Sequence, residues 1–212
     1  KLVALGDFPI LKQWISEDYE TVREASKRRP RNEVARFILQ DLDSAYYYMK
    51  TTAPMSNRLN KDCAALLKSR VALFEGTWEK YHKGTARVPG GPGWPGAEKD
   101  YLKDFTIDID SEIKFFLTEA KEAAQIVADK YPLFNDYPSL FNSQSLSNAS
   151  EVLLWRAYDA SLTPSVNHFV VGYIQRNGGG NTGWTRSMMQ TYLMENGLPI
   201  YAGNSGYQGD KS

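Results

Sequence analysis

Apolar side chains recur every three or four positions in three long stretches of the chain, which predicts three amphipathic helices. They cover residues 33–49, 60–81 and about 111–130. The positions expected to face the core are Val34, Phe37, Ile38, Leu42, Ala45 and Met49 on the first helix, Cys63, Leu66, Leu67, Val71, Phe74, Trp78 and Tyr81 on the second, and Ile113, Phe116, Leu117, Ala120, Ala124 and Val127 on the third.

Polar residues that can cap a helix stand near the start of two of these stretches. Asn32 is the expected N-cap of the first helix, and Asp110 or Ser111 is the expected N-cap of the third. Only a short turn separates the first two helices, so we expect them to be antiparallel neighbours. Neither can bury its apolar stripe alone, and the pair is typical of one unit of a tetratricopeptide-like array.

The remaining segments are rich in residues that interrupt helices. Glycine and proline crowd residues 84–98, which predicts a long loop, and another loop is expected beyond Tyr131. Two short apolar runs, 151–158 and 168–174, favour strands, although their periodicity leaves a buried helical turn open. A short helix in TRSMMQTYLM and a tight turn at Asn196-Gly197 are expected near the end of the sequence.

These elements predict a mainly α fold, with tetratricopeptide-like helical hairpins and a loop-rich region that contains a few short strands. A length of 212 residues fits one domain, 1–212. Within it, residues 30–131 are expected to form the helical scaffold and residues 132–212 the loop-rich region on the ligand side.

Composition narrows the choice of partner. The formal net charge is zero, so the chain lacks the broad positive field that binding to nucleic acid or to an anionic membrane surface needs. Aromatic residues make up 13% of the sequence, and rings that fill no core are typical of a surface that meets a ligand. The single cysteine, Cys63, is expected to be a core thiol because it has no partner for an internal disulfide.

Five segments, in this order along the chain, resemble the motifs of the SusD/RagB family of glycan-binding lipoproteins. The segments reach from about residue 6 to residue 200. They are GDFPI at 6–10, RPRNEVARFILQDLDSA at 29–45, NRLNKDCAALLKSRVALFEGTWEKY at 57–81, SNASEVLLWRAYD at 147–159 and TRSMMQTYLMENGLPI at 185–200.

The resemblance implies a function without catalysis. Proteins of this family capture oligosaccharide or polysaccharide on the extracellular face of the outer membrane and deliver it to a SusC-like TonB-dependent transporter for nutrient uptake. It also implies that further segments flank this chain at both ends, among them an N-terminal lipid anchor. The helices would then contact the transporter and the loops would hold the sugar.

Sugar recognition needs flat aromatic faces with amide, carboxylate or guanidinium groups at their edges. Trp94 and Trp184 are the leading candidates, because each lies in or beside a glycine-rich loop; for Trp94 the alternative is a loop anchor. Trp78, Trp155 and Trp14 are instead expected to pack internally. The full set of candidate glycan-binding residues is Trp94, Trp184, Arg176, Asn177, Asn181 and Tyr173.

Other site signals are weaker. The stretch GGGNTG at 178–183 fits a dinucleotide fingerprint, but the turn at 196–197 leaves no room for the rest of the nucleotide-binding unit. Asp108, Asp110 and Glu112 begin like a calcium loop and are better explained as helix capping. We therefore expect no cofactor and no metal.

Two further interpretations stay open at this stage. The basic run Lys27, Arg28, Arg29 and Arg31 could contact phosphate or an acidic sugar, or could be surface decoration. For the whole protein, the alternatives to glycan capture are a tetratricopeptide-like adaptor that binds a peptide and, less favoured, a glycoside hydrolase with two carboxylates across a cleft.

Overall fold

The computed structural model describes residues 1–51, 57–143, 145–156 and 185–209, and its contacts divide the chain into two compact units, Lys1–Ala157 and Tyr158–Ser212. The predicted mainly α class is confirmed, since the described residues form helices and no sheet. The β-pairing among them consists of two isolated bridges, Phe8 with Arg29 and Leu193 with Pro199.

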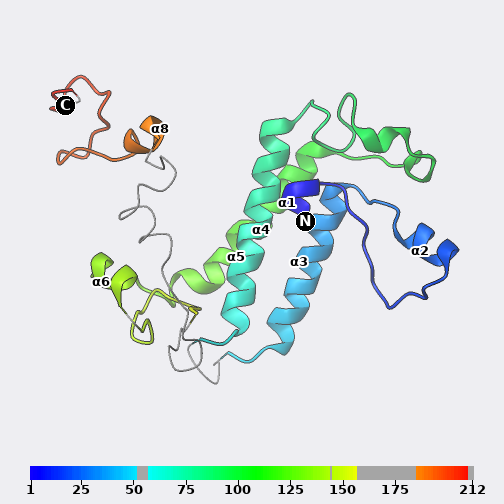
Figure 1. The fold of residues 1–212 in the computed structure, drawn as a ribbon, viewed down its shortest axis with the longest axis horizontal. Helices are drawn as coiled ribbons and strands as arrows, with labels where there is room; N and C mark the ends of the chain where they lie inside the picture. The colour runs from blue at the N-terminus through cyan, green and yellow to red at the C-terminus, as the bar shows by residue number, and fades with distance from the viewer. Residues whose placement is uncertain (52–56, 144, 157–184, 210–212) are drawn as a thin grey trace, which may run out of the picture. The chain divides into compact units, whose positions relative to one another are not determined.

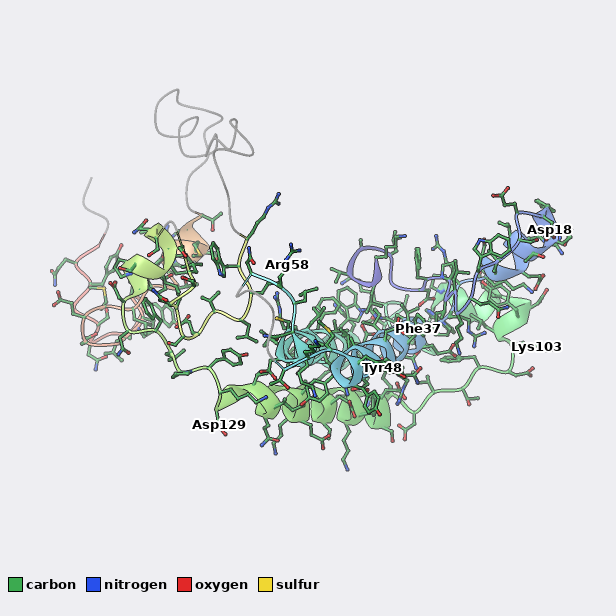
Figure 2. All side chains as sticks on the ribbon, turned by 90° about the horizontal axis from the view of Figure 1, so that it is seen from below. Asp18, Phe37, Tyr48, Arg58, Lys103 and Asp129 are labelled. Atoms are coloured by element: carbon green, nitrogen blue, oxygen red, sulfur yellow. The ribbon has the colours of Figure 1, made fainter. Side chains whose placement is uncertain are left out.

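Three long helices form the first unit: α3 (Arg31–Tyr48), α4 (Lys61–His82) and α5 (Ile109–Ala128). Each lies within two residues of its predicted bounds. Helix α4 packs against both α3 and α5, and each neighbour runs antiparallel to it (Figure 1). Figure 2 shows α5 between the segment that carries Lys103 and Asp129, the residue that follows the helix.

The starts of these helices are capped in different ways. The side chain of Asn60 accepts a hydrogen bond from the Cys63 amide at 3.0 Å, and Asp108, rather than Asp110 or Ser111, caps α5. The prediction of Asn32 as a cap is wrong. Helix α3 begins at Arg31, whose amide donates to the distant Asp7 carboxylate at 2.9 Å, so a tertiary contact provides the first acceptor.

The buried face of α4 differs from the predicted one. The leucines of the expected stripe are exposed, as at Leu67, which is 49% exposed. The residues that the structure buries on α4 are small or acidic: Asp62, Ala64, Ala65, Ala72, Glu75, Gly76 and Glu79. Because α4 lies between two helices, small side chains allow both to approach it closely. At Gly76, a Cβ atom would lie only 3.0 Å from the Leu117 side chain of α5.

The core of this unit lies where the three helices meet. Its buried members are Leu2, Val34, Ala35, Leu39, Ala72, Phe116 and Ala120. On α5 the predicted apolar stripe is correct, with Phe116, Ala120 and Val127 buried. Removing these apolar surfaces from water supplies the main driving force for packing, about 25 cal/mol for each Å² buried.

Shorter elements surround the bundle. They are α1 (Leu2–Leu5), α2 (Tyr19–Ala25) and the 3-10 helices η1 (Pro95–Glu98) and η2 (Asp100–Leu102). Trp14, expected to pack internally, is 85% exposed in the connection between α1 and α2.

The segment after α5 corrects two predictions. Helix α6 (Tyr137–Asn142) stands where a loop was expected, because Asp136 caps it and Pro138 suits its first turn. Residues 151–156 of the expected strand form none, and the other expected strand, 168–174, lies outside the described residues. The segment is tied to α4 through Asp62, which accepts from Lys130 Nζ at 2.8 Å and Tyr131 Oη at 3.0 Å.

In the second unit, described over 185–209, the predicted short helix and tight turn are both present. Helix α8 (Arg186–Met189) has Thr185 as its cap. The turn at Asn196-Gly197 is closed by the Met194 amide, which donates to the Leu198 carbonyl at 2.8 Å. The Asn196 side-chain amide also donates to the carbonyls of Asn204 and Ser205, each at 3.1 Å, and so fastens the end of this segment.

Candidate ligand-binding site

A cavity of about 540 Å3 opens at the end of the bundle where α3 begins and α4 ends. The residues that line it come from the α1 segment, the start of α3, the last turns of α4 and the loop that leads to α5. Figure 1 shows where these segments lie at one end of the bundle. The volume lies within the range of about 300–1,000 Å3 that small-molecule sites span. The side chains that give it chemical character are Asp7, Arg28, Arg31, Trp78, Arg87, Trp94, Lys99 and Tyr101.

Arg31 is a buried residue of the cavity lining whose side chain is fixed by its neighbours. Its guanidinium donates two hydrogen bonds to the Glu75 carboxylate, both at 2.7 Å, and both side chains are buried. The guanidinium carbon also lies 4.3 Å from the centre of the Trp78 ring, which adds a cation–π contact. Two hydrogen bonds and a stacked ring hold Arg31 in one orientation.

Asp7 connects the α1 segment to the loop after α4. Its carboxylate accepts from the Trp94 indole N–H at 2.9 Å as well as from the Arg31 amide, so each oxygen has a partner. Burial raises the pKa of Asp7, and the hydrogen bond from Trp94 partly opposes that rise. The three segments that meet at Asp7 are therefore fixed to one another.

Trp94 takes the position of a loop anchor. Its side chain is 5% exposed and packs against Phe105, with ring centres 5.3 Å apart. Gly96 permits this packing, because a Cβ atom there would come within 2.1 Å of the indole. An edge of the ring still lines the cavity, and its role in glycan binding stays a prediction.

The other five candidate glycan-binding residues lie outside the described residues. They are Trp184, Arg176, Asn177, Asn181 and Tyr173. The dinucleotide-like stretch 178–183 also lies there. Their role in glycan binding stays a prediction.

Sequence reasoning missed two aromatic residues of the cavity. Trp78 was expected to belong to the core, but it is half-buried, lines the cavity and donates from its indole to the Arg87 carbonyl at 3.2 Å. Tyr101 also lines the cavity, with Lys27 Nζ 5.5 Å from its ring centre. The signal that could have revealed Trp78 is the basic run ahead of α3, since Arg31 stacks on its ring.

A second cavity of about 520 Å3 adjoins Tyr101 and Leu102 and is lined in part by Asn32 and Arg36. Arg36 donates two hydrogen bonds to Glu112, at 3.0 and 2.7 Å, and its guanidinium lies 3.6 Å from the centre of the Phe115 ring. The Asn32 amide adds a bond to Glu112 at 3.3 Å. Helices α3 and α5 are thus joined by a polar contact as well as by apolar packing.

Glu79 lies among these charges without a hydrogen bond. Its side chain is fully buried, and neither carboxylate oxygen has a partner among the described residues. Burial raises the pKa of Glu79 to about 8, and the negative charges of Glu75 and Glu112 add to the rise. The neutral acid is therefore the main form of Glu79 at neutral pH.

The acidic residues Asp108 and Asp110, at the start of α5, have structural roles. Asp108 caps the helix, as the capping interpretation predicts, and Asp110 pairs with Lys83 at 2.6 Å. Within the described ranges no group of three or more His, Cys, Asp or Glu side chains is arranged to hold a metal ion. Across the same ranges, no helix has the length and hydropathy needed to cross a bilayer.

Comparisons of the chain with protein-family models, with curated proteins and with solved structures found no match.

Proposed function

We propose that this protein captures saccharide at the cell surface without modifying it and passes it to a TonB-dependent transporter of the outer membrane. The observation that carries this proposal is the cavity of about 540 Å3 at the end of the helical bundle, with aromatic side chains and fixed polar groups in one wall. The five ordered segments that resemble the SusD/RagB family support it from the sequence.

The lining of the cavity suits a sugar. Tyr101 and the half-buried Trp78 provide aromatic surface for the C–H face of a sugar ring, and guanidinium groups from Arg28 and Arg87 can donate to hydroxyls at its edge. The bonds of Arg31 and Asp7 within the protein hold the wall in place before a ligand arrives, which lowers the entropy cost of binding.

The same lining favours binding over hydrolysis. Hydrolysis of a glycosidic bond generally needs two carboxyl groups across the bond, about 5 to 10 Å apart. Among the residues that line this cavity, Asp7 is the one carboxylate, and both of its oxygens are already hydrogen-bonded within the protein. Capture without chemistry is therefore the activity that we propose.

The partner and location follow from the resemblance alone. A lipid anchor ahead of this chain would hold the protein on the extracellular face of the outer membrane, beside a SusC-like transporter. In this arrangement the antiparallel helices α3, α4 and α5 serve as the rigid frame. The gene next to that of this protein is expected to encode such a transporter.

Isothermal titration calorimetry of the full-length protein against a panel of polysaccharides tests the proposal. We expect binding to at least one member and a loss of about tenfold in affinity for Tyr101→Ala, which removes an aromatic wall. Tyr81→Ala is the matched control, since Tyr81 is 77% exposed on α4 and does not line the cavity. Binding to no polysaccharide in the panel would refute glycan capture.

A peptide-binding adaptor remains the second candidate function, because leucines on α4 are exposed. Leu66 and Leu73, seven positions apart on α4, are 37% and 51% exposed. Recovery of a specific peptide, with no response to any saccharide, would favour the adaptor. Release of reducing sugar from the panel would instead indicate a hydrolase.

A further inference from the structure

We infer that the saccharide held by the cavity at the end of the bundle carries an anionic group, a carboxylate or a sulfate. This inference rests on the proposed function and specifies its ligand class. It comes from the charges of the lining residues. Two of these, Arg28 and Arg31, belong to the basic run for which the sequence allowed either contact with an acidic ligand or a place on the surface without function.

Cations gather around this cavity in a protein whose formal net charge is zero. Arg28, Arg87 and Lys99 reach its wall from separate segments, and none of the three forms an ion pair with another described residue. Because the whole chain is neutral, this local excess reflects where the three residues are placed. It creates a positive potential that attracts an anion into the cavity.

The other two charged residues that line the cavity already have partners within the protein. Arg31 is paired with the buried Glu75 carboxylate. Asp7, the one carboxylate among the lining residues, accepts hydrogen bonds at both oxygens from within the protein. Glu75 is matched by Arg31, and the single charge of Asp7, which also acts on Arg28, cannot balance three cations. The lining therefore keeps an excess of positive charge that can meet a ligand.

The basic run before α3 is divided between different tasks. Arg29 turns to Glu33 and makes two hydrogen bonds at 2.7 and 2.9 Å, beside the second cavity. Lys27 lies over the Tyr101 ring. Arg28 and Arg31 line the first cavity, so they are more than surface charges without a role.

The chemistry of these groups selects the ligand class. A guanidinium presents a planar fork of donors that matches a carboxylate or a sulfate, whereas a neutral hydroxyl uses one donor at a time. Arg28, Arg87 and Lys99 are exposed at the rim, so their charges stay hydrated until the ligand binds. The aromatic residues Trp78 and Tyr101 then supply the surface for the sugar ring.

Matched pairs of ligands test the charge directly. The full-length protein is titrated with oligogalacturonates and with their methyl esters, in which a small neutral ester replaces each carboxylate. It is also titrated with sulfated dextran oligosaccharides and with unsulfated dextran oligosaccharides of the same length. We expect at least tenfold tighter binding to one acidic member than to its neutral counterpart, and a weakening of that preference in high salt. The arm that responds identifies the anionic group.

Charge-removing variants connect the preference to this cavity. The triple variant Arg28→Gln, Arg87→Gln and Lys99→Gln is expected to lose at least tenfold in affinity for the acidic ligand and a smaller factor for its neutral counterpart, because glutamine keeps a hydrogen-bond donor and removes only the charge. The control triple variant Arg70→Gln, Lys114→Gln and Lys121→Gln removes the same charge from exposed positions that do not line the cavity, and is expected to bind as the wild type does. Circular dichroism verifies that both variants keep their helices.

The possible outcomes separate the inference from the proposed function. Equal affinity for acidic and neutral members overturns the inference and leaves glycan capture standing. An equal loss of binding in both triple variants also overturns it, because the effect then comes from overall charge. If neither acidic nor neutral saccharides bind, the proposed function fails and the inference fails with it.

Discussion

Two ion pairs at the same end of the first unit have similar lengths and very different surroundings. Arg31 and Glu75 lie 2.7 Å apart with side chains 4% and 0% exposed, while Lys83 and Asp110 lie 2.6 Å apart with side chains 47% and 72% exposed. Each pair connects α4 or its C-cap to a neighbouring helix. Water can readily replace a lost partner in the exposed pair, but it has little access to the buried one.

The difference shows where polar groups determine this fold. Removing one member of a buried pair leaves a charge without solvent or partner, which costs several kcal/mol, whereas exposed pairs contribute about 1 kcal/mol or less. At the buried end the pair also orients Arg31 over Trp78, so the same contact shapes the wall of the cavity. Stability and the candidate site therefore depend on the same residues there.

The largest effect is expected for Glu75→Ala. This change leaves the Arg31 guanidinium buried and unpaired, and we expect the free energy of unfolding to fall by about 3–5 kcal/mol. Urea unfolding followed by circular dichroism measures it. The double variant Arg31→Met, Glu75→Leu removes both charges and is expected to recover most of the loss; a double variant as unstable as the single one would show that packing, and not charge, dominates.

The next effect concerns pH and Glu79. Burial raises the pKa of Glu79 to about 8, above its ordinary value of 4.5, so the folded state holds a proton that the unfolded state releases. The contribution of Glu79 to stability is complete below about pH 4.5 and is lost as the pH rises to about 8. Between pH 6 and pH 8 the expected loss is about 2 kcal/mol.

Glu79→Gln removes this titration and is expected to flatten the decline in stability between pH 6 and pH 8. Urea unfolding at several pH values compares it with the wild type. Glu122→Gln, a change at an exposed carboxyl of α5, is the control and should keep the decline. The same slope in the wild type and in Glu79→Gln would rule out Glu79 as its source.

A smaller effect is expected for Trp94→Phe. This change removes the donor to one oxygen of the partly buried Asp7 carboxylate, and we expect a loss of about 1–3 kcal/mol in stability. Thermal unfolding of the variant is compared with that of Trp14→Phe, whose ring is 85% exposed and whose replacement should be neutral. Equal melting temperatures for the two variants would contradict the anchoring role of Trp94.

The smallest effect is expected for Lys83→Ala, because the pair with Asp110 is exposed at both ends. The loss should be below about 1 kcal/mol and should shrink as salt is added. Urea unfolding at low and high salt measures both. A loss as large as that of Glu75→Ala would erase the distinction between the two pairs.

The sequence was sufficient for the three long helices but insufficient for the orientation of α4. Spacing of apolar residues located α3, α4 and α5, because each has a continuous helical period. The same spacing led to the wrong prediction that the leucine face of α4 is buried. Hydrophobicity alone does not indicate that a helix packed between two neighbours buries its smallest side chains. Ala64, Ala65, Ala72 and Gly76 were the available signal.

The candidate site was harder to predict, because its parts are distant in sequence. Arg31 and Glu75 are 44 positions apart, and Asp7 and Trp94 are 87 apart, so no local pattern joins them. Trp94 was found from its position in a glycine-rich loop, but its burial depends on Asp7 and Phe105. Charges in a basic run gain a role only after folding separates Arg28 from Arg29.

The contact at Gly76 has a consequence for how the bundle can vary. Where a hydrogen atom stands in place of a side chain, the separation of α4 and α5 is set by the backbone itself and by Leu117 and Phe116. An added methyl group would widen the gap between the two axes or displace Leu117. The distance and tilt between these two helices therefore depend on the absence of a side chain at position 76.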